Sequence, residues 1–299
     1  MKLAMVRPNP SESARPAVVI SGERVLWLKD LLGMDAPISI DQMIQSDHES
    51  WLKALRSAYT SRTWQGTMSR DMVWESPIEF HRNPLCIGRN YRDHAQEAIR
   101  SGVAKHVNEE FPIFFTKATT TLNHHLGEVT AFDATQALDY EAELGVVIGR
   151  AGRRIDREDA ETMIFGYTLV NDITARDVQQ RHQQWFLGKS FDGFCPVGPV
   201  VVTRDEVPWP LNLAIRLAVN GEERQMFNTR AMIFDVADQI AWLSRAMTLL
   251  PGDLIATGTG DGVGRSFTPP RYLSPGDRVD IDCSVIGRLT TLVVDHEGQ

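Results

Sequence analysis

The chain has 299 residues, of which 42% are hydrophobic and 23% are charged, and its formal net charge at pH 7 is −8. This composition is ordinary for a globular enzyme, and the negative balance argues against nucleic acid or an anionic membrane as the main partner. Three cysteines without C-x-x-C spacing argue against a disulfide framework or a structural zinc site, and no apolar run is long enough to span a membrane.

The first 75 residues are predicted to form a small N-terminal α/β domain. Residues 17–20 and 25–28 are predicted strands, joined across Ser21-Gly22-Glu23, and residues 41–59 carry apolar residues at helical spacing. The polar stretch 63–77 is typical of a linker. We therefore expect the main domain to span residues 76–299. The N-terminus has no signal-peptide pattern, so we expect a cytoplasmic protein.

The main domain is rich in strand patterns. Apolar residues alternate over 211–219 and are followed by Asn220-Gly221, the preferred pair for a type I′ hairpin turn, and 279–285 with 289–294 predict another pair of strands. Helices are predicted from Asp156 to about residue 165, and from Asp235 to a stop at Pro251-Gly252. Because strands and helices do not alternate regularly, we predict a strand-dominated α+β fold rather than a doubly wound sheet.

A possible catalytic pair follows the first strand of this domain. The apolar run from Cys86 ends at Gly88, and Asn90 is a candidate N-cap for a helix that carries His94 and Glu97 on one face. A glutamate that orients a histidine makes a general base able to activate water. The alternative is an ordinary surface pair on a helix.

The most informative segment is residues 138–148, where apolar and acidic residues alternate. The period of two predicts a strand with Glu141 and Glu143 on one face. Two like charges on an apolar strand are costly to desolvate, and a hard divalent cation is the simplest compensation. Asp172, at the end of a strand predicted from Phe165, would complete an oxygen-only site of the kind that Mg²⁺ or Mn²⁺ needs. The alternatives are a solvated strand face and an Asx turn at Asp172.

Two glycine-rich segments follow along the chain. Lys189 lies in residues 188–199 on a predicted tight loop, where it is either surface decoration or the cation that meets an anionic substrate. The glycines of residues 257–264 do not fit G-x-G-x-x-G. We therefore expect a loop whose backbone and Thr259 hydroxyl approach a ligand, and no dinucleotide site.

Taken in order, these segments resemble the fumarylacetoacetate hydrolase superfamily over roughly residues 81–295. The resemblance rests on six motifs, which are G-R-N-Y-x-x-H-x-x-E at 88–97, Y-E-A-E-L at 140–144, N-D-I-T-A-R-D-x-Q at 171–179, G-K-S-F-D at 188–192, L-L-P-G-D-L-I-A-T-G-T at 249–259 and P-P-R-Y-L-x-P-G-D at 269–277. It implies a mixed β-sandwich-like roll for the main domain. Members of the family are usually homodimers or larger, so a homodimer is expected.

The resemblance also implies roles for individual residues. Glu141, Glu143 and Asp172 would bind Mg²⁺ or Mn²⁺, and His94 with Glu97 would form the water-activating dyad on a lid segment. The implied substrate site is lined by Lys189, as a catalytic cation, and by Gln179 and Thr259, with Arg89 and Lys117 as further substrate contacts. The chain departs from the family pattern at Ala118 and Gly260, where proline is common, and at Asn123-His124-His125. These departures bear on the choice of substrate. A second metal site at His124-His125 is disfavoured because adjacent strand residues point to opposite faces.

The implied activity is a Mg²⁺/Mn²⁺-dependent hydrolase that cleaves a C–C bond in a small 2,4-dioxo acid, such as an acylpyruvate or fumarylpyruvate, through a metal-stabilised enolate. The same enolate arises when an oxaloacetate-like acid is decarboxylated or when an aromatic ring-cleavage diacid undergoes keto–enol isomerisation, and the sequence does not separate these reactions. A non-catalytic protein with a structural cation is a third alternative, against which His94, Glu97, Lys189 and Gln179 together argue. The expected partner is a small anionic 2-oxo acid, with no nucleic acid and no membrane.

Overall fold

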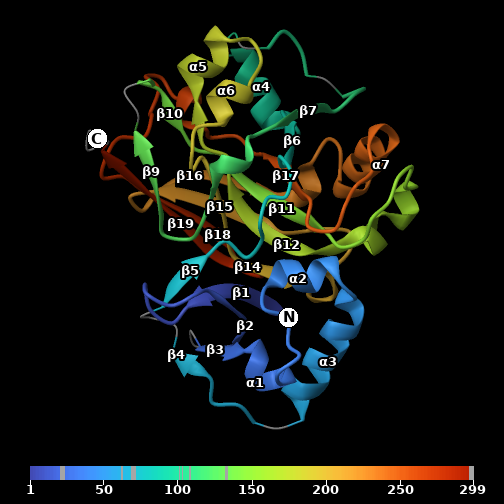
Figure 1. Cartoon of the computed structure of the whole chain (residues 1–299). Coiled ribbons are helices and arrows are strands. Elements are labelled where there is room, and N and C mark those ends of the chain that lie inside the picture. The colour runs from blue at the N-terminus through green and yellow to red at the C-terminus, as the bar shows by residue number, and fades with distance from the viewer. Residues whose placement is uncertain are drawn as a thin grey trace.

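The computed structural model describes residues 1–20, 24–61, 63–68, 72–100, 102, 104–107, 109–131 and 134–295. In these ranges the chain is a mixed α+β fold dominated by two sheets (Figure 1). The predicted turn at Ser21-Gly22-Glu23 lies outside the described residues. No helix in the described ranges is both long and apolar enough to cross a membrane.

The larger sheet has twelve strands and runs through the whole molecule, in the order β4-β3-β2-β1-β14-β12-β11-β17-β6-β7, with β5 on β1 and β8 on β14. Its strands are β1 (Lys2–Arg7), β2 (Arg15–Ile20), β3 (Arg24–Trp27), β4 (Thr67–Met68), β5 (Val73–Glu75), β6 (Leu85–Gly88), β7 (Ile113–Thr116), β8 (Leu122–Asn123), β11 (Ala142–Ile148), β12 (Ile164–Asn171), β14 (Cys195–Thr203) and β17 (Leu254–Thr259). Every residue of β11, β12, β14 and β17 is buried, as expected for central strands covered on both faces.

The smaller sheet has the order β16-β15-β18-β19-β9. Its strands are β9 (Gly127–Ala131), β15 (Ala214–Val219), β16 (Glu222–Asn228), β18 (Arg278–Cys283) and β19 (Gly287–Asp295), and a separate ladder joins β10 (Leu138–Asp139) to β13 (Thr174–Ala175). The predicted hairpin turn is confirmed, because Asn220 and Gly221 have φ angles of 52° and 82°, as a type I′ turn requires. The predicted pairing after Cys283 is also confirmed, by β18 and β19.

The two faces of the larger sheet bury different cores. Val146 of β11 belongs to a cluster with Ile215 and Ile281 of the smaller sheet. Its neighbour Val147 belongs to a cluster with Met43 and Leu55 of the N-terminal helices. Alternate side chains of a strand point to opposite faces, so the larger sheet is the middle layer of the molecule.

The N-terminal segment extends the larger sheet instead of forming a sheet of its own. Leu3 of β1 pairs with Val201 of β14, so hydrogen bonds of the sheet connect the segments on either side of the predicted boundary at residue 75. The predicted linker is wrong in part, because it contains β4 and β5, which pair with β3 and β1. Figure 1 shows the N-terminal strands and helices gathered in blue at one end of the molecule. The division into two domains stays a prediction.

The helices are α1 (Leu28–Leu32), α2 (Ile40–Gln45), α3 (His48–Thr60), α4 (Arg92–Arg100), α5 (Arg176–Arg181), α6 (Phe186–Lys189) and α7 (Val236–Ala246), and the short 3₁₀ helices are η1 (Thr119–Thr121), η2 (Arg157–Met163), η3 (Arg204–Glu206), η4 (Thr229–Ala231) and η5 (Gly264–Ser266). The single helix predicted over 41–59 is wrong in its continuity. Ser39 caps α2 and Asp47 caps α3, each by accepting a backbone hydrogen bond, so the chain starts a second helix there.

Two other predicted helices differ in outcome. The helix expected after Asp156 is the 3₁₀ helix η2, and β12 follows it directly. Only Ala160 and Met163 of its seven residues are buried, so it has no apolar face that would favour an α-helix. The helix after Asp235 is confirmed as α7, which starts with a reciprocal capping box between Asp235 and Asp238 and ends at Ala246, before the predicted stop.

Candidate active site

Four strand ends meet at one edge of the larger sheet. Because β11 is antiparallel to both β12 and β17, its first residues pair with their last ones, Ala142 with Asn171 and Glu143 with Thr259. Strand β6 runs parallel to β17 and also ends there, at Gly88. Helices α4, α5 and α6 cover this edge (Figure 1). The topology therefore gathers side chains that are far apart in the sequence.

The predicted strand over 138–148 is interrupted, and the interruption shapes the site. Tyr140 and Glu141 lie between β10 and β11. The backbone N–H of Glu141 donates to Asn171 Oδ1 (3.3 Å), and its carbonyl accepts from the N–H of Asp172 (2.9 Å). These bonds hold Glu141 beside the end of β12 even though it is outside the strand.

Three carboxylates form a compact buried cluster at this point. Glu141, Glu143 and Asp172 are 6%, 1% and 0% exposed, and each offers a carboxylate oxygen within 4.8 Å of the others. Lys189 Nζ donates to Glu141 Oε2 (2.8 Å) and to Asp172 Oδ2 (2.5 Å). The structure thus brings together the three predicted metal ligands and the predicted catalytic cation.

The charges of this cluster are only partly compensated by the protein. Burial would raise the pKa of Glu141, but the cations of Lys189 and Arg176 hold it well below its usual range. Burial, followed by the negative charges of Asp172 and Glu141, raises the pKa of Glu143 well above its usual range. A hard divalent cation binds oxygen ligands, and its positive charge would favour the ionised form of Glu143. These three residues could therefore hold Mg²⁺ or Mn²⁺.

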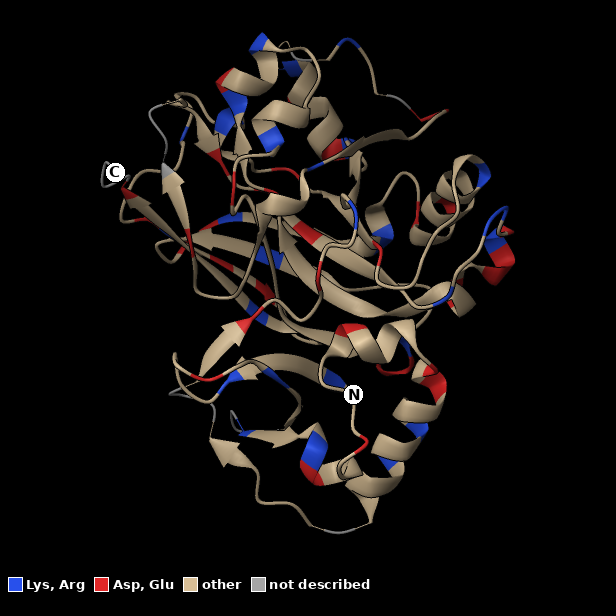
Figure 2. Ribbon diagram, in the orientation of Figure 1, with Lys and Arg blue, Asp and Glu red and all other residues tan. Residues whose placement is uncertain are grey.

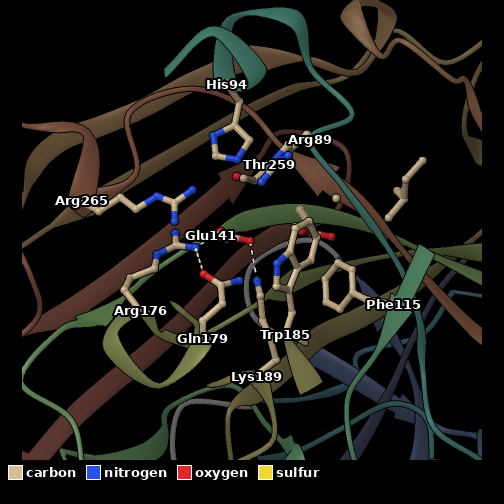
Figure 3. A pocket seen from close by; sticks show the side chains of 13 residues that line it. Arg89, His94, Phe115, Glu141, Arg176, Gln179, Trp185, Lys189, Thr259 and Arg265 are labelled. Carbon is tan, nitrogen blue, oxygen red and sulfur yellow. Dashed lines mark hydrogen bonds and ion pairs between the residues drawn. The ribbon is translucent and has the colours of Figure 1, made fainter. Parts of the chain in front are cut away.

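His94 and Glu97 of α4 lie on the other side of the pocket. His94 is buried and the side chain of Glu97 is 11% exposed, so they are not an exposed surface pair, and His94 Nδ1 lies 3.5 Å from Glu97 Oε2. Glu97 Oε1 also accepts from the N–H of Gly262 (2.9 Å). Burial opposes ionisation of Glu97, but its hydrogen bonds from His94 and Gly262 lower its pKa. An ionised Glu97 favours a proton on Nδ1 of His94 and leaves Nε2 as a proton acceptor, and Figure 3 shows the imidazole pointing into the pocket.

Asn90 does not cap α4, which corrects the prediction. Its side-chain amide donates to the carbonyls of Phe234 (3.0 Å) and Thr257 (2.9 Å), and its Oδ1 accepts from the N–H of Phe234 (2.9 Å). Asn90 is 1% exposed. It therefore joins the start of α4 to β17 and to the segment before α7, and so positions the helix that carries His94.

Lys189 lies at the end of the four-residue helix α6, not on a loop as predicted, and is 2% exposed. A Cβ on Gly188 would lie 2.6 Å from the backbone nitrogen of Gln179, so glycine lets α6 pack directly on α5. Figure 2 shows blue basic segments on these two helices, next to the sheet edge that carries the carboxylates. Burial would lower the pKa of Lys189, but Asp172 and Glu141 outweigh it and raise the pKa.

The pocket between these groups is lined by charged and aromatic side chains. Its lining includes the predicted residues Arg89, His94, Glu141, Glu143, Gln179, Lys189 and Thr259, together with Phe115, Arg176, Trp185 and Arg265 (Figure 3). The rings of Phe115 and Trp185 meet edge to face with centroids 5.2 Å apart, and the guanidinium of Arg89 lies 5.3 Å from the Trp185 ring centroid. These rings form an aromatic wall of the pocket, and Lys189 Nζ lies 5.1 Å from the Phe115 ring centroid.

Lys117 does not line the pocket. It is fully buried, and its Nζ donates to Asp172 Oδ1 (2.6 Å) and to the carbonyl of Ile173 (3.0 Å), so it supports Asp172 from the protein interior.

Sequence reasoning missed Arg176 and Arg265 as pocket residues. Arg176 stands inside the 171–179 motif, which is a signal that could have found it, whereas nothing in the spacing marked Arg265.

The chain is similar to known proteins both in sequence and in fold. Residues 84–294 match the family model described as fumarylacetoacetate (FAA) hydrolase C-terminal. Oxaloacetate tautomerase YisK of Bacillus subtilis (strain 168) is 48% identical over 213 residues, covering 71% of this chain and 69% of the relative. The crystal structure of maleylpyruvate hydrolase from Sphingobium sp. SYK-6, in complex with manganese (II) ion and pyruvate, is 30% identical with a TM-score of 0.78 and covers 100% of both chains. Fumarylacetoacetate hydrolase from psychrophilic Exiguobacterium antarcticum is 34% identical with a TM-score of 0.81, covering 99% of this chain and 100% of that structure.

Proposed function

This chain belongs to the fumarylacetoacetate hydrolase family, and on that premise we propose that it is a metal-dependent keto–enol tautomerase of a small 2-oxo acid. The observation that carries the proposal is the position of His94, whose imidazole points into a pocket that also holds Glu141, Glu143 and Lys189. A tautomerase needs one group that takes a proton from one atom of the substrate and returns it to another, beside positive charge that stabilises the enolate.

The carboxylate cluster is the proposed metal site. Glu141, Glu143 and Asp172 would hold Mg²⁺ or Mn²⁺ through oxygen ligands alone, in keeping with the manganese that the maleylpyruvate hydrolase structure contains. When bound, the cation would supply Lewis-acid chemistry that polarises the 2-oxo group and makes the neighbouring C–H more acidic.

The side chains of the pocket account for the rest of the reaction. Lys189, whose pKa is raised by its carboxylate neighbours although burial opposes this, stays protonated and neutralises charge on the oxo oxygen as it develops. His94 Nε2 accepts the proton from the substrate carbon or from the enol oxygen and returns it to the other. Glu97 holds His94 in the tautomer that makes this possible. The aromatic wall of Phe115 and Trp185 excludes water from one side.

The tautomerase reading is also supported by the 48% identity over 213 residues to an oxaloacetate tautomerase. C–C hydrolysis of a 2,4-dioxo acid, which the sequence resemblance implied, is the second candidate. It is favoured by the contact between His94 and Glu97, because an oriented histidine is also what water activation needs. Decarboxylation would need the metal site and a final proton donor, but no base to activate water.

A substrate panel tests the proposal. The purified protein is assayed with the enol form of oxaloacetate, followed by the loss of its ultraviolet absorbance, and with an acylpyruvate, followed by release of pyruvate. The proposal predicts rapid enol-to-keto conversion and slow or no pyruvate release. Rapid pyruvate release without enol conversion would replace it with the hydrolase. Light scattering on the same preparation tests the expected homodimer.

A further inference from the structure

Two arginines face each other in the pocket with unsatisfied nitrogens. Arg176 is 2% exposed; its Nε donates to Asp139 Oδ2 (2.8 Å) and its Nη1 lies 2.7 Å from Glu141 Oε1. Its Nη2 is buried and has no hydrogen-bond partner among the described residues, and the same holds for the Nε of Arg265. Both residues line the pocket, and Figure 3 shows their guanidinium groups directed toward each other below His94.

The position of this pair is fixed by one buried carboxylate. Asp139 is 0% exposed and binds Arg176 through its side chain. It also accepts the backbone N–H groups of Gly264 (2.7 Å) and Arg265 (3.1 Å) at the start of η5. Asp139 therefore holds α5 and η5 together, and it places the two arginines against each other as a consequence of the fold.

Holding the guanidinium groups of Arg176 and Arg265 against each other destabilises the folded protein unless an anion lies between them. Burial, followed by the nearby charge of Arg176, lowers the pKa of Arg265 to about 10. A buried guanidinium nitrogen without an acceptor also loses its hydration without replacement. Of the cations that line the pocket, Arg176 and Lys189 already pair with the buried carboxylates of Asp139, Glu141 and Asp172. The Nη2 of Arg176 and the Nε of Arg265 are still left without an acceptor among the described residues. A negative group between Arg176 and Arg265 would satisfy both nitrogens at once.

We propose that Arg176 and Arg265 bind a second carboxylate of the substrate, so that the enzyme selects 2-oxo dicarboxylic acids over uncharged analogues of the same size. The inference rests on the proposed function, since it identifies the far end of that substrate. Guanidinium groups are the side chains best matched to carboxylate geometry. Because Arg176 also contacts Glu141, the second carboxylate would lie close to the carboxylate cluster, which suits a short diacid such as oxaloacetate.

The first test compares two substrates that differ only in the far group. Enol conversion of oxaloacetate and of its 4-methyl ester is measured for the wild type, Arg265→Gln and Arg265→Lys. Wild type should prefer the free acid. Arg265→Gln should lower kcat/KM for the free acid roughly 10- to 100-fold, the usual scale for a lost charged hydrogen bond, and change kcat/KM for the ester less than about 3-fold. Arg265→Lys should lie between them. Arg271→Gln is the matched control, because Arg271 is exposed and its guanidinium pairs with Glu222 (2.5 Å) away from the pocket.

Binding provides a readout that does not depend on turnover. Calorimetry in the presence of Mn²⁺ compares malate with 2-hydroxybutanoate, which has a methyl group in place of the second carboxylate. Wild type should bind malate more tightly, and Arg265→Gln should remove that preference. Equal losses for free acid and ester in Arg265→Gln, or no loss in either, would overturn the assignment. The assignment would also be overturned if inorganic phosphate binds in an Arg265-dependent way while the wild type shows no preference for oxaloacetate over its ester. Arg176 and Arg265 would then bind an anion other than the substrate.

The outcomes separate this inference from the proposed function. A wild type that converts neither oxaloacetate nor its ester contradicts the tautomerase itself. A wild type that converts both at equal rates keeps the tautomerase and refutes the carboxylate subsite.

Discussion

Glu143→Gln should make the metal-free protein more stable, by an amount that grows with pH. Glu143 is 1% exposed, and burial, followed by the charges of Asp172 and Glu141, raises its pKa well above the usual range. Gln keeps the shape of the side chain, and its Oε1 can still accept the hydrogen bond that the N–H of Gly258 donates to Glu143 (2.9 Å). The substitution therefore replaces an ionisable side chain by a neutral one without creating a cavity.

The sign of the pH dependence follows from proton linkage. The folded wild type retains a proton at Glu143 that the unfolded chain has already lost above its ordinary pKa of about 4.3. Folding of the wild type is then penalised by about 1.4 kcal/mol for each pH unit, until the raised pKa is passed. With roughly 2.1 cal/mol/K of unfolding entropy per residue, 299 residues give about 0.6 kcal/mol/K, so the variant should gain about 2 °C in Tm per pH unit over the wild type.

Thermal unfolding in EDTA at a series of pH values between about 5 and 8 measures this difference. Glu158→Gln is the matched control, because Glu158 is exposed and the same chemical change there should give a constant difference in Tm. Excess Mg²⁺ or Mn²⁺ should reverse the order, since the wild type gains stability from the bound cation and the variant loses a ligand. A difference in Tm between Glu143→Gln and wild type that does not change with pH would show that the pKa of Glu143 is not raised in the folded protein.

Three further predictions concern the dyad and its support. His94→Ala should lower turnover by about 10²-fold or more, the scale of a positioned acid–base group, while Mn²⁺ affinity measured by calorimetry changes little. A variant that loses metal but keeps its rate per bound metal would show that His94 is a metal ligand and not the acid–base group. Glu97→Gln should suppress any acylpyruvate hydrolysis more than enol conversion, because water attack needs the stronger base, and equal losses in the two assays would show that the dyad acts in a step common to both. Asn90→Ala removes one buried and two partly buried hydrogen bonds and should cost roughly 2–4 kcal/mol in urea unfolding. A cost below about 0.5 kcal/mol would show that Asn90 does not hold α4.

The residues of the carboxylate cluster could be predicted because strand periodicity is a local signal. Alternation placed Glu141 and Glu143 on the same side of the chain, and Asp172 followed a recognisable strand. The interruption at Tyr140 could not be predicted, because it depends on contacts with distant residues. Asp139 binds Arg176 and the N–H of Gly264, and these are brought to it only by the completed fold.

Other features failed to appear in the sequence for related reasons. Helix α6 has four residues, which is too short for a hydrophobic period, and its place is set by the close packing of Gly188 on α5. The pairing of β1 with β14 joins residues about two hundred positions apart, and no local pattern reports such a partner. The break between α2 and α3 did leave a signal, because Asp47 is a strong N-cap residue inside the predicted helix.

We propose that Glu141, Glu143 and Asp172 form the metal site at which enol conversion takes place. The most direct measurement is the rate of oxaloacetate enol conversion by metal-stripped protein as Mn²⁺ is added, for the wild type and Glu141→Gln. Wild-type activity should rise from near zero to a plateau and should be abolished by EDTA. Glu141→Gln should stay inactive at the Mn²⁺ concentration that saturates the wild type. Its Tm without metal should lie somewhat below that of the metal-free wild type, because Gln loses the ion pairs with Arg176 and Lys189 that lower the pKa of Glu141. Full wild-type activity in excess EDTA, or full activity of Glu141→Gln, would contradict the proposal.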